Sequence, residues 1–354
     1  MAGGTGGHVF PALAAARVLR ERGFEPVWLG TERGMEARLV PPAQIPIEWV
    51  SVVGLRGKGA TAWLLAPFHL LRALRQSLAV IRRRRPDVVL GAGGFVSGPG
   101  GVAAWLARCP LVIHEQNAVA GLTNRLLSRL AVRVLEAFPG SFGRRNIECV
   151  GNPVRREIAQ LPAPRERFAK HEGPLRLFVV GGSQGAARLN AVLPAALALL
   201  PAELRPQVIH QAGESHYQKT TQSYLEQGVA AQVRAFIDDM ADMYAWADLV
   251  VCRAGALTVS ELAAAGVGAI FIPFAAAVDD HQTRNAEYLV RVNAARLIAE
   301  KDLSPQRLAS ELKAVLSGGR AYLLEMAESA RQQAITDADV RLAEVCIAAA
   351  GAQK

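Results

Sequence analysis

The stretch LRLFVVGGSQGAARLN (residues 175–190) carries the strongest indication of a fold class in this chain. An apolar run, a glycine-rich turn and the start of a periodic helix follow one another directly. A strand buried on both faces of a parallel sheet reads as such a continuous apolar run. The glycines after it let backbone amides approach an anion at a helix N-terminus. This unit predicts an open α/β sheet whose ligands bind beyond the carboxyl ends of the strands.

Similar apolar runs that end in Gly or in a polar loop recur on both sides of this stretch. They are EPVWLG (25–30), PDVVLGAGG (86–94), PLVIHEQN (110–117), PQVIHQAG (206–213), ADLVVCRAG (247–255) and GAIFIPF (268–274). Helical patterns follow most of them, at 11–22, 100–107, 121–130, 185–199, 257–265 and 280–292. This alternation predicts an α/β protein with parallel sheets.

A proline-rich join divides the alternating pattern into two series. Four prolines mark it: Pro153, Pro162, Pro164 and Pro174. We expect two doubly wound domains that face each other across a cleft, one at 1–154 and one at 155–334. The last helix, at about 336–350, has no strand after it, so we expect residues 335–354 to cross back to the first domain.

Composition narrows the class of protein without deciding it. The chain has 354 residues, a formal net charge of +9 and four cysteines without metal-type spacing, for which we expect four reduced, buried thiols. It has no apolar run long enough to span a membrane and no secretory signal pattern. The positive charge favours nucleic acid, anionic lipid or a phosphorylated substrate as a partner. Basic proteins are also common in high-GC genomes, where Arg replaces Lys, so the charge alone decides nothing.

Three glycine-rich turns are candidate phosphate sites, at 3–8, 91–101 and 181–185. None ends in the Lys-Ser/Thr of a P-loop, and none is a clean dinucleotide fingerprint with a later ribose-binding acid. These absences disfavour ATP and NAD, and the turns suit a diphosphate held without a metal. Only Met1 and Ala2 precede the first turn, where a strand is expected. We expect a start codon assigned too late, since a missing central strand costs several kcal/mol.

Polar residues at the ends of predicted strands are candidate site residues, each with a structural alternative. Glu261, one turn after Thr258, suits two ribose hydroxyls, but the pair also fits a capping box. Asn117 can donate to a sugar hydroxyl or an acetamide. His8, at a helix start, is a candidate general base or a packing residue. The cluster Asp279, Asp280 and His281 fits helix capping better than a metal site.

A basic amphipathic segment spans residues 55–89. Its apolar residues at helical spacing are Leu64, Phe68, Leu71, Leu74, Leu78 and Ile81. Its basic residues are Arg56, Lys58, Arg72, Arg75 and Arg82 to Arg85. The segment suits an anionic membrane surface, or a helix that covers the sheet. Few aromatic residues interleave with the charges, which disfavours nucleic acid as a partner.

Eight motifs, in order along nearly the whole chain, carry a resemblance to a known family. They are GGTGGHVFPALA, GLRGKG, PDVVLGAGGFVSGPGGVAAW, HEQNAVAGLTNR, GNPVR, VVGGSQGA, FIDDM and CRAGALTVSELAAAG. Together they resemble the MurG family of bacterial peptidoglycan N-acetylglucosaminyltransferases, of glycosyltransferase family 28 type. The resemblance implies a GT-B fold, which is two Rossmann-like domains with a cleft between them.

The resemblance also implies a reaction. N-acetylglucosamine would move from UDP-N-acetylglucosamine to the 4-hydroxyl of lipid I, the undecaprenyl-diphosphate-linked N-acetylmuramoyl-pentapeptide, giving lipid II and UDP. The anomeric centre would invert, with no metal or other cofactor. The enzyme would be peripheral on the cytoplasmic face of the cell membrane, with cell-wall or division proteins as candidate partners.

Site residues carry over from the resemblance onto matching motifs. The substrate-binding set is Thr5, Gly6, Gly7, Asn117, Arg155, Ser183, Ile237, Ala256, Leu257, Thr258, Val259, Ser260, Glu261 and Gln282. In it, Ile237 would meet uracil through its backbone, Glu261 would hold the ribose, and Ser183 with the helix after it would face the diphosphate. Arg155 could offset the diphosphate charge, while Gln282 and Asn117 would read the sugar. His8 is the first candidate for the base and Glu115 the second.

Other readings remain open at this point. A UDP-N-acetylglucosamine 2-epimerase shares the fold and the donor but needs no lipid-facing basic segment. A non-catalytic membrane module would bind the UDP-sugar without turning it over. A nicotinamide-dependent oxidoreductase is disfavoured because the ribose-binding acid of the fingerprint is missing.

Overall fold

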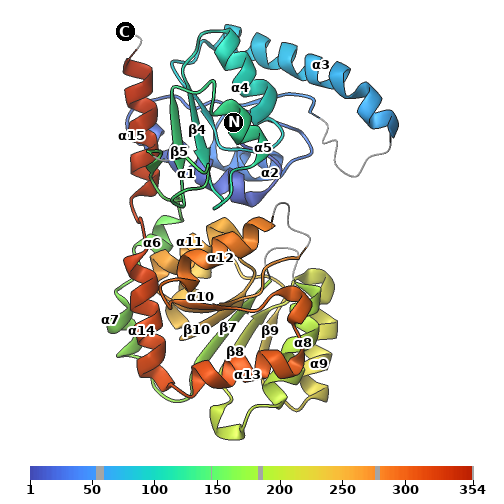
Figure 1. Ribbon diagram of the computed structural model, residues 1–354, viewed down its shortest axis with the longest axis vertical. Coiled ribbons are helices and arrows are strands. Elements are labelled where there is room, and N and C mark those ends of the chain that lie inside the picture. The colour runs from blue at the N-terminus through green and yellow to red at the C-terminus, as the bar shows by residue number, and fades with distance from the viewer. Residues whose placement is uncertain (53–59, 145, 182–185, 276–279, 353–354) are drawn as a thin grey trace. The chain divides into compact units, whose positions relative to one another are not determined.

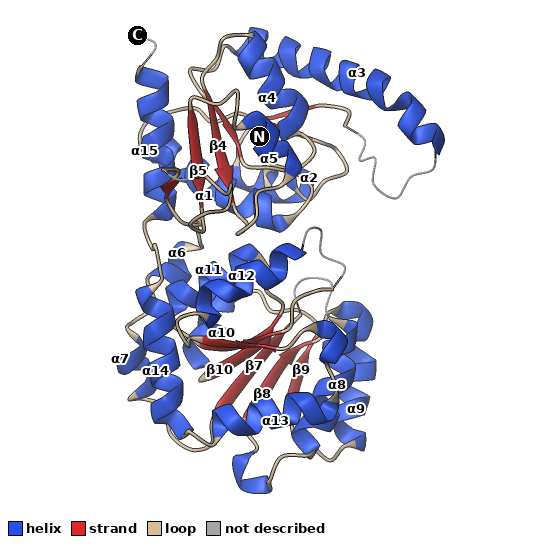
Figure 2. Cartoon of the chain, viewed as in Figure 1, coloured by secondary structure: helices blue, strands red, loops and turns tan. Residues whose placement is uncertain are grey.

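The computed structural model describes residues 1–52, 60–144, 146–181, 186–275 and 280–352 (Figure 1). The chain divides into two compact units: the first holds Met1–Val154 and Ile335–Lys354, and the second holds Arg155–Ala334. Each unit combines helices with parallel strands (Figure 2). Every strand pairing among the described residues is parallel. The predicted class, two α/β domains with parallel sheets, is therefore confirmed.

The second unit contains a six-stranded sheet. Its order is β12 (Ala295–Leu297), β11 (Gly268–Phe271), β10 (Leu249–Cys252), β7 (Arg176–Val180), β8 (Gln207–Gln211) and β9 (Gln232–Arg234). The chain leaves β7 toward β8 on one side and later returns to place β10 on the other side. The strand order therefore reverses between β7 and β10, and ligands of doubly wound sheets bind at the carboxyl side of such a point.

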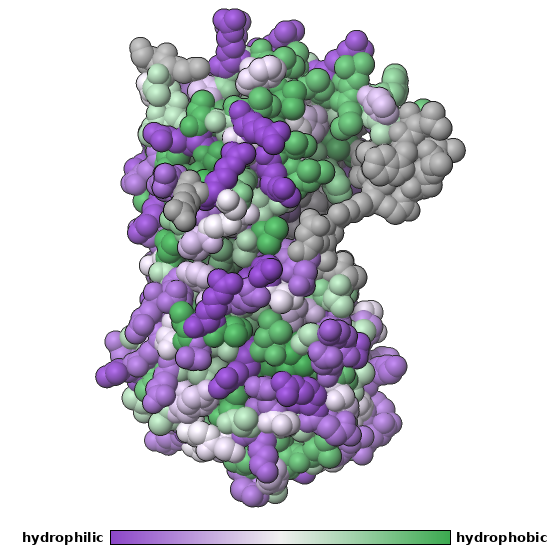
Figure 3. Space-filling view, in the orientation of Figure 1, coloured by the Kyte–Doolittle hydropathy of each residue, from purple (hydrophilic) through white to green (hydrophobic). Residues whose placement is uncertain are grey.

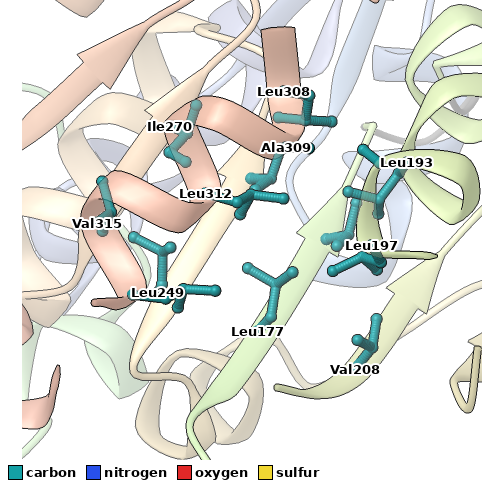
Figure 4. Packing of buried hydrophobic residues seen from close by; sticks show 14 of the residues in the cluster. Leu177, Leu193, Leu197, Val208, Leu249, Ile270, Leu308, Ala309, Leu312 and Val315 are labelled. Carbon is teal, nitrogen blue, oxygen red and sulfur yellow. The ribbon is translucent and has the colours of Figure 1, made fainter. Parts of the chain in front are cut away.

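Helices cover both faces of this sheet. They are α6 (Arg156–Ala159), α7 (Pro164–Phe168), α8 (Ala187–Ala198), α9 (Tyr217–Glu226), α10 (Met240–Trp246), α11 (Ala256–Ala265), α12 (His281–Val290), α13 (Pro305–Leu316) and α14 (Gly319–Gln332). On one face, Leu308 and Leu312 of α13 pack over Leu177 and Leu249 of the strands (Figure 4). The next residues along these strands, Phe178 and Val250, point to the other face and are also fully buried, so packing on both faces holds the strands in place.

The first unit has two sheets. One pairs β1 (Trp28–Gly30) with β2 (Ile47–Trp49). The other has the order β3 (Val89–Gly91), β4 (Leu111–Glu115), β5 (Arg133–Glu136) and β6 (Glu148–Cys149). The helices are α1 (Gly6–Glu21), α2 (Glu36–Leu39), α3 (Ala60–Arg84), α4 (Ser97–Leu106), α5 (Leu122–Leu127) and α15 (Ala338–Gly351). The C-terminal helix α15 packs on α1 and β4, where Leu342 and Cys346 join Ala15 and Val112 in one buried cluster.

Met1 takes the place of a strand beside β3. Its amine donates to Leu90 O at 2.8 Å, and Ala92 N donates to Met1 O at 2.9 Å. A residue in a parallel strand bonds its neighbour in this alternating way. A cavity of about 540 Å³ adjoins Met1 and is lined by residues of β1 and β3, among them Trp28 and Leu90. The first glycine turn therefore starts at the carboxyl edge of the sheet.

The expectation of four buried thiols is correct for two of the cysteines and wrong for the other two. All four cysteines are free; Cys252 and Cys346 are buried, whereas Cys109 and Cys149 are only partly buried. Among the described residues, no helix is both long enough and apolar enough to cross a membrane.

Candidate active site

In the second unit, the candidate site begins where β10 ends. Arg253, Ala254 and Gly255 follow Cys252, and α11 starts at Ala256 with Gly255 as its N-cap. The predicted run Ala256–Glu261 therefore forms the first turns of a helix beside the reversal point of the sheet. The first amides of such a helix have no partners within it, and they favour an anion.

Glu261 lies inside this unit, with 4% of its surface exposed. Its Oε1 accepts from Arg155 Nε at 3.1 Å, and the Tyr244 hydroxyl donates to its Oε2 at 3.2 Å. Burial raises the pKa of Glu261, and the charge of Arg155 opposes that shift. Thr258 is the third residue of α11 and not its N-cap, so the capping-box alternative is wrong. Glu261 is instead a buried carboxylate in a polar pair, a setting typical of functional sites.

One amide side chain and one carboxylate, those of Gln282 and Glu300, hold the loop after β11. Phe274 N donates to Gln282 Oε1 at 2.9 Å, and Ala275 N donates to Glu300 Oε2 at 2.8 Å. Arg253, from the loop before α11, pairs with Glu300. Gln282, the residue predicted to contact the donor sugar, is thus hydrogen-bonded to the loop between β11 and α12.

The remaining predicted residues of this unit lie in other loops or outside the described residues. Ile237 is buried in the loop between β9 and α10, whose N-cap is Asp239. Ser183 lies outside the described residues, as does Asp279 of the alternative metal cluster. Asp280 stands at the N-cap of α12 and accepts from the Thr283 hydroxyl at 2.6 Å. Within the described ranges, no three His, Cys, Asp or Glu side chains are grouped as metal ligands.

In the first unit, Thr5 is the N-cap of α1, and Gly6 and Gly7 form its first turn. Gly94 lies against Gly3: a Cβ at Gly94 would come within 2.2 Å of Gly3 O, and the φ of Gly94 is +83°. Only glycine allows this approach, which joins the first two glycine turns. The joined turns present amides at the carboxyl edge of β3.

A buried carboxylate, that of Glu36, is hydrogen-bonded to the backbone of the first glycine turn. Glu36 is fully buried and accepts from Gly4 N at 3.0 Å, from Thr31 N at 2.9 Å and from Thr31 Oγ1 at 2.7 Å. Nothing in the sequence pattern indicated this role, because Glu36 lies 32 residues from Gly4.

We expect Glu36→Gln to lower the free energy of unfolding by about 1–3 kcal/mol, because whichever oxygen is replaced by NH₂ then faces a backbone N–H donor, that of Gly4 or that of Thr31. Thermal unfolding of the full chain checks this. The control is Glu32→Gln, an exposed neighbour whose change should leave the midpoint unaltered. Equal midpoints for the two variants would contradict the supporting role of Glu36.

Glu115 organises the loop after β4. It is 1% exposed. Its Oε1 accepts from Asn117 N and Nδ2 at 2.9 and 3.2 Å, and its Oε2 accepts from Gly121 N and Asn124 Nδ2 at 3.1 and 2.9 Å. Four donors thus surround the carboxylate and fix the orientation of Asn117.

His8 is the half-buried third residue of α1. Its Nδ1 lies 2.9 Å from Gln116 Oε1, on the loop after β4. The backbone of Gly93 covers the ring, since a Cβ at Gly93 would lie 2.8 Å from His8 Nδ1. The structure therefore brings His8 to the loops that follow β3 and β4, two partners that its position at a helix start does not indicate.

Two family models and several relatives match nearly the whole length of the chain. Models of the glycosyltransferase family 28 N-terminal and C-terminal domains match residues 1–136 and 176–352. A UDP-N-acetylglucosamine–N-acetylmuramyl-(pentapeptide) pyrophosphoryl-undecaprenol N-acetylglucosamine transferase of Nitrosococcus oceani is 58% identical over 98% of this chain and 97% of its own. The enzyme of the same name from Marinobacter nauticus is 56% identical over 99% and 96%.

A solved structure extends this likeness to three dimensions. The crystal structure of Acinetobacter baumannii MurG superposes with a TM-score of 0.86, at 40% sequence identity and with 98% of each chain covered. The two domain models, the sequence identities and the structural superposition therefore all indicate the same family. This chain belongs to glycosyltransferase family 28.

Proposed function

We propose that this chain transfers N-acetylglucosamine from UDP-N-acetylglucosamine to lipid I, giving lipid II and UDP. The relatives that match nearly its full length carry this activity in their names. One structural observation carries the proposal: a buried carboxylate, Glu261, lies in a helix that begins at the reversal point of a parallel sheet. That arrangement suits a nucleoside diphosphate, with ribose at the carboxylate and phosphates at the helix start.

The second unit supplies the donor site in this proposal. Glu261 has further acceptor positions beside those used by Arg155 and Tyr244, because an ionised carboxylate offers about four. It would take the ribose hydroxyls. The Ile237 backbone would meet uracil, and Gln282 would read the sugar. Arg155, already at Glu261, would add positive charge near the diphosphate.

The first unit supplies the acceptor site and the base. The 4-hydroxyl of the acceptor attacks the anomeric carbon as the bond from that carbon to the UDP oxygen breaks. The hydroxyl proton passes to His8, and UDP leaves with its electron pair on the phosphate. Backbone amides at helix starts stabilise the leaving diphosphate, since they are oriented before charge develops. Glu115, surrounded by four donors, holds Asn117 toward the sugar.

Product analysis tests the function directly. The full chain is incubated with UDP-N-acetylglucosamine and a lipid I analogue, and we expect UDP and the lipid II analogue in equal amounts. UDP-N-acetylgalactosamine is the control donor and should react far more slowly. Release of free 2-epimerised sugar without acceptor would support the epimerase. Donor binding in calorimetry with no product from either reaction would support the non-catalytic module.

The first unit also carries an apolar surface that suits a membrane. Phe68 of α3 is 65% exposed, Leu122 of α5 is 69% exposed, and Trp105 at the end of α4 is 52% exposed. The helix α4 packs against both α3 and α5, so these side chains belong to neighbouring helices. Figure 3 shows hydrophobic residues gathered around these helices. Exposed arginines accompany them: Arg72, Arg75, Arg125 and Arg129.

This surface, made by α3, α4 and α5 with its arginines, would bind the anionic cytoplasmic face of the membrane as a peripheral protein. Apolar side chains enter the interface while arginines meet lipid phosphates. The C-terminal part of α3 covers the sheet, which was the alternative prediction for this segment. Its side chains Leu74, Leu78 and Ile81 pack in the core cluster with residues of β3 and β4. Leu64, Arg56 and Lys58 of the predicted segment have no described side chains.

We expect the variant Phe68→Ser/Leu122→Ser to bind phosphatidylglycerol vesicles at least about tenfold more weakly, because each apolar side chain contributes up to about 2 kcal/mol when buried. Vesicle sedimentation measures this. The matched control is Leu199→Ser/Leu225→Ser in the second unit, which removes equally exposed leucines. Equal binding by both variants would refute the assignment of this surface.

A further inference from the structure

A chain of hydrogen bonds in the first unit links His8 to the interior. His114 Nε2 lies 2.9 Å from Gly151 O, Gln116 Nε2 lies 3.0 Å from His114 Nδ1, and His8 Nδ1 lies 2.9 Å from Gln116 Oε1. His114 and Gln116 are buried, with 0% and 1% of their surfaces exposed. His8 stands at the outer, half-buried end of the chain.

Each bond in this chain has one allowed direction. A backbone carbonyl only accepts, so His114 carries its proton on Nε2 and donates it to Gly151 O. Burial lowers the pKa of His114 to about 4, so the ring is neutral near pH 7 and its Nδ1 is an acceptor. Gln116 therefore turns its NH₂ group toward His114 and its carbonyl oxygen toward His8.

A second contact fixes the same orientation of Gln116 independently. Gln116 Nε2 also donates to His114 O at 3.1 Å. A flipped amide would place two acceptors against each other there. The oxygen of Gln116 therefore faces His8, and His8 must donate to it from Nδ1. A neutral His8 then has its lone pair on Nε2, away from the buried chain.

We propose that Gln116 and His114 are positioning residues that hold neutral His8 in the tautomer protonated on Nδ1, so that Nε2 is free of hydrogen and takes the proton of the acceptor hydroxyl. The tautomer follows from the hydrogen bonds alone, whereas its use as a base rests on the proposed function. When Nε2 gains the proton, Nδ1 keeps its hydrogen bond to Gln116, so no other group has to move. The amide orients the ring without taking up a proton itself.

The tautomer is measured by NMR on the full chain labelled with ¹⁵N-histidine. The sequence has seven histidines, and the signal missing from His8→Gln identifies His8. We expect correlations of a protonated Nδ1 and an acceptor Nε2 for His8 in its neutral form. The opposite pattern, with the proton on Nε2, would overturn the proposal whether or not the enzyme is active.

Two substitutions of Gln116 test the consequence for turnover. Gln116→Leu keeps the volume and removes both hydrogen bonds. We expect His8 to lose its fixed tautomer and kcat to fall about 10- to 100-fold, as for other groups that orient a functional histidine. The KM for UDP-N-acetylglucosamine should stay within about twofold. An unchanged kcat in this variant would overturn the positioning role while leaving the transferase activity established.

Gln116→Glu is the conservative variant. One of its oxygens still accepts from His8 Nδ1, while the other faces His114 Nδ1 and His114 O, which are both acceptors, so that oxygen must carry a proton. The protonated side chain keeps the hydrogen-bond pattern of the amide, so we expect more activity than in Gln116→Leu. Less activity than in Gln116→Leu would contradict the proposal. Ser128→Ala, which removes one buried hydrogen bond to Arg125 O in the same unit, is the control and should change neither the tautomer nor kcat.

Discussion

Replacing Glu261 by Ala is expected to raise the KM for UDP-N-acetylglucosamine about 100-fold. A hydrogen bond to a charged group contributes about 1.5–3 kcal/mol, and the ribose offers two hydroxyls to this carboxylate. Calorimetric titration with the donor should show the same loss of affinity as the kinetics. Because Arg155 keeps 39% of its side chain exposed, it can turn to solvent when its partner is removed.

The control for this variant is Tyr244→Phe. It removes the bond to Glu261 Oε2 and keeps the ring that packs on Phe178, so donor affinity should fall only slightly. Acidification gives a second readout in the unmodified enzyme. Burial raises the pKa of Glu261, so donor affinity should begin to fall at a higher pH than for an ordinary glutamate. Unchanged donor affinity in Glu261→Ala would refute the ribose assignment.

Replacing His8 by Ala is expected to lower kcat by about 10²- to 10⁴-fold, the range typical of a lost general base. Donor affinity should stay within about twofold, because the proposed donor contacts of the ribose and uracil come from other residues. Initial rates at saturating donor and acceptor measure kcat, and calorimetry measures donor affinity.

Chemical rescue sharpens the test of His8. Added imidazole should restore part of the rate of His8→Ala, because the space left by the ring admits a small base. It should leave Glu261→Ala unaffected, and this variant is the matched control. Full turnover by His8→Ala without imidazole would exclude His8 as the base and leave Glu115 as the remaining candidate.

The strands that could be predicted are those with continuous apolar runs. β4, β7, β10 and β11 are buried along most of their length, and each matches such a run. The unpredicted β2, β5, β6, β9 and β12 are shorter or partly exposed, so their sequences lack that signal. The helix α1 begins at Gly6, five residues before the predicted start at 11, because the glycine turn itself enters the helix.

Residue types at strand ends and the family resemblance indicated the candidate site residues, but not their partners. Glu261 and Thr258 fitted either a ribose site or a capping box in the sequence. The position of Gly255 as N-cap excludes the capping box, and the ribose site stays a prediction. Glu115 and His8 were both candidate bases. The contacts favour His8, since four donors occupy Glu115 while His8 leaves one ring nitrogen outside the buried chain.

The class of fold, the family and the residues at the ends of the main strands follow from the sequence, because those signals are periodic or local. What those residues contact depends on how the folded chain packs. Arg155 reaches Glu261 across 106 residues of sequence, and His8 reaches Gln116 across 108. Side-chain orientation at such distances depends on how strands and helices pack, and neither spacing nor composition records it.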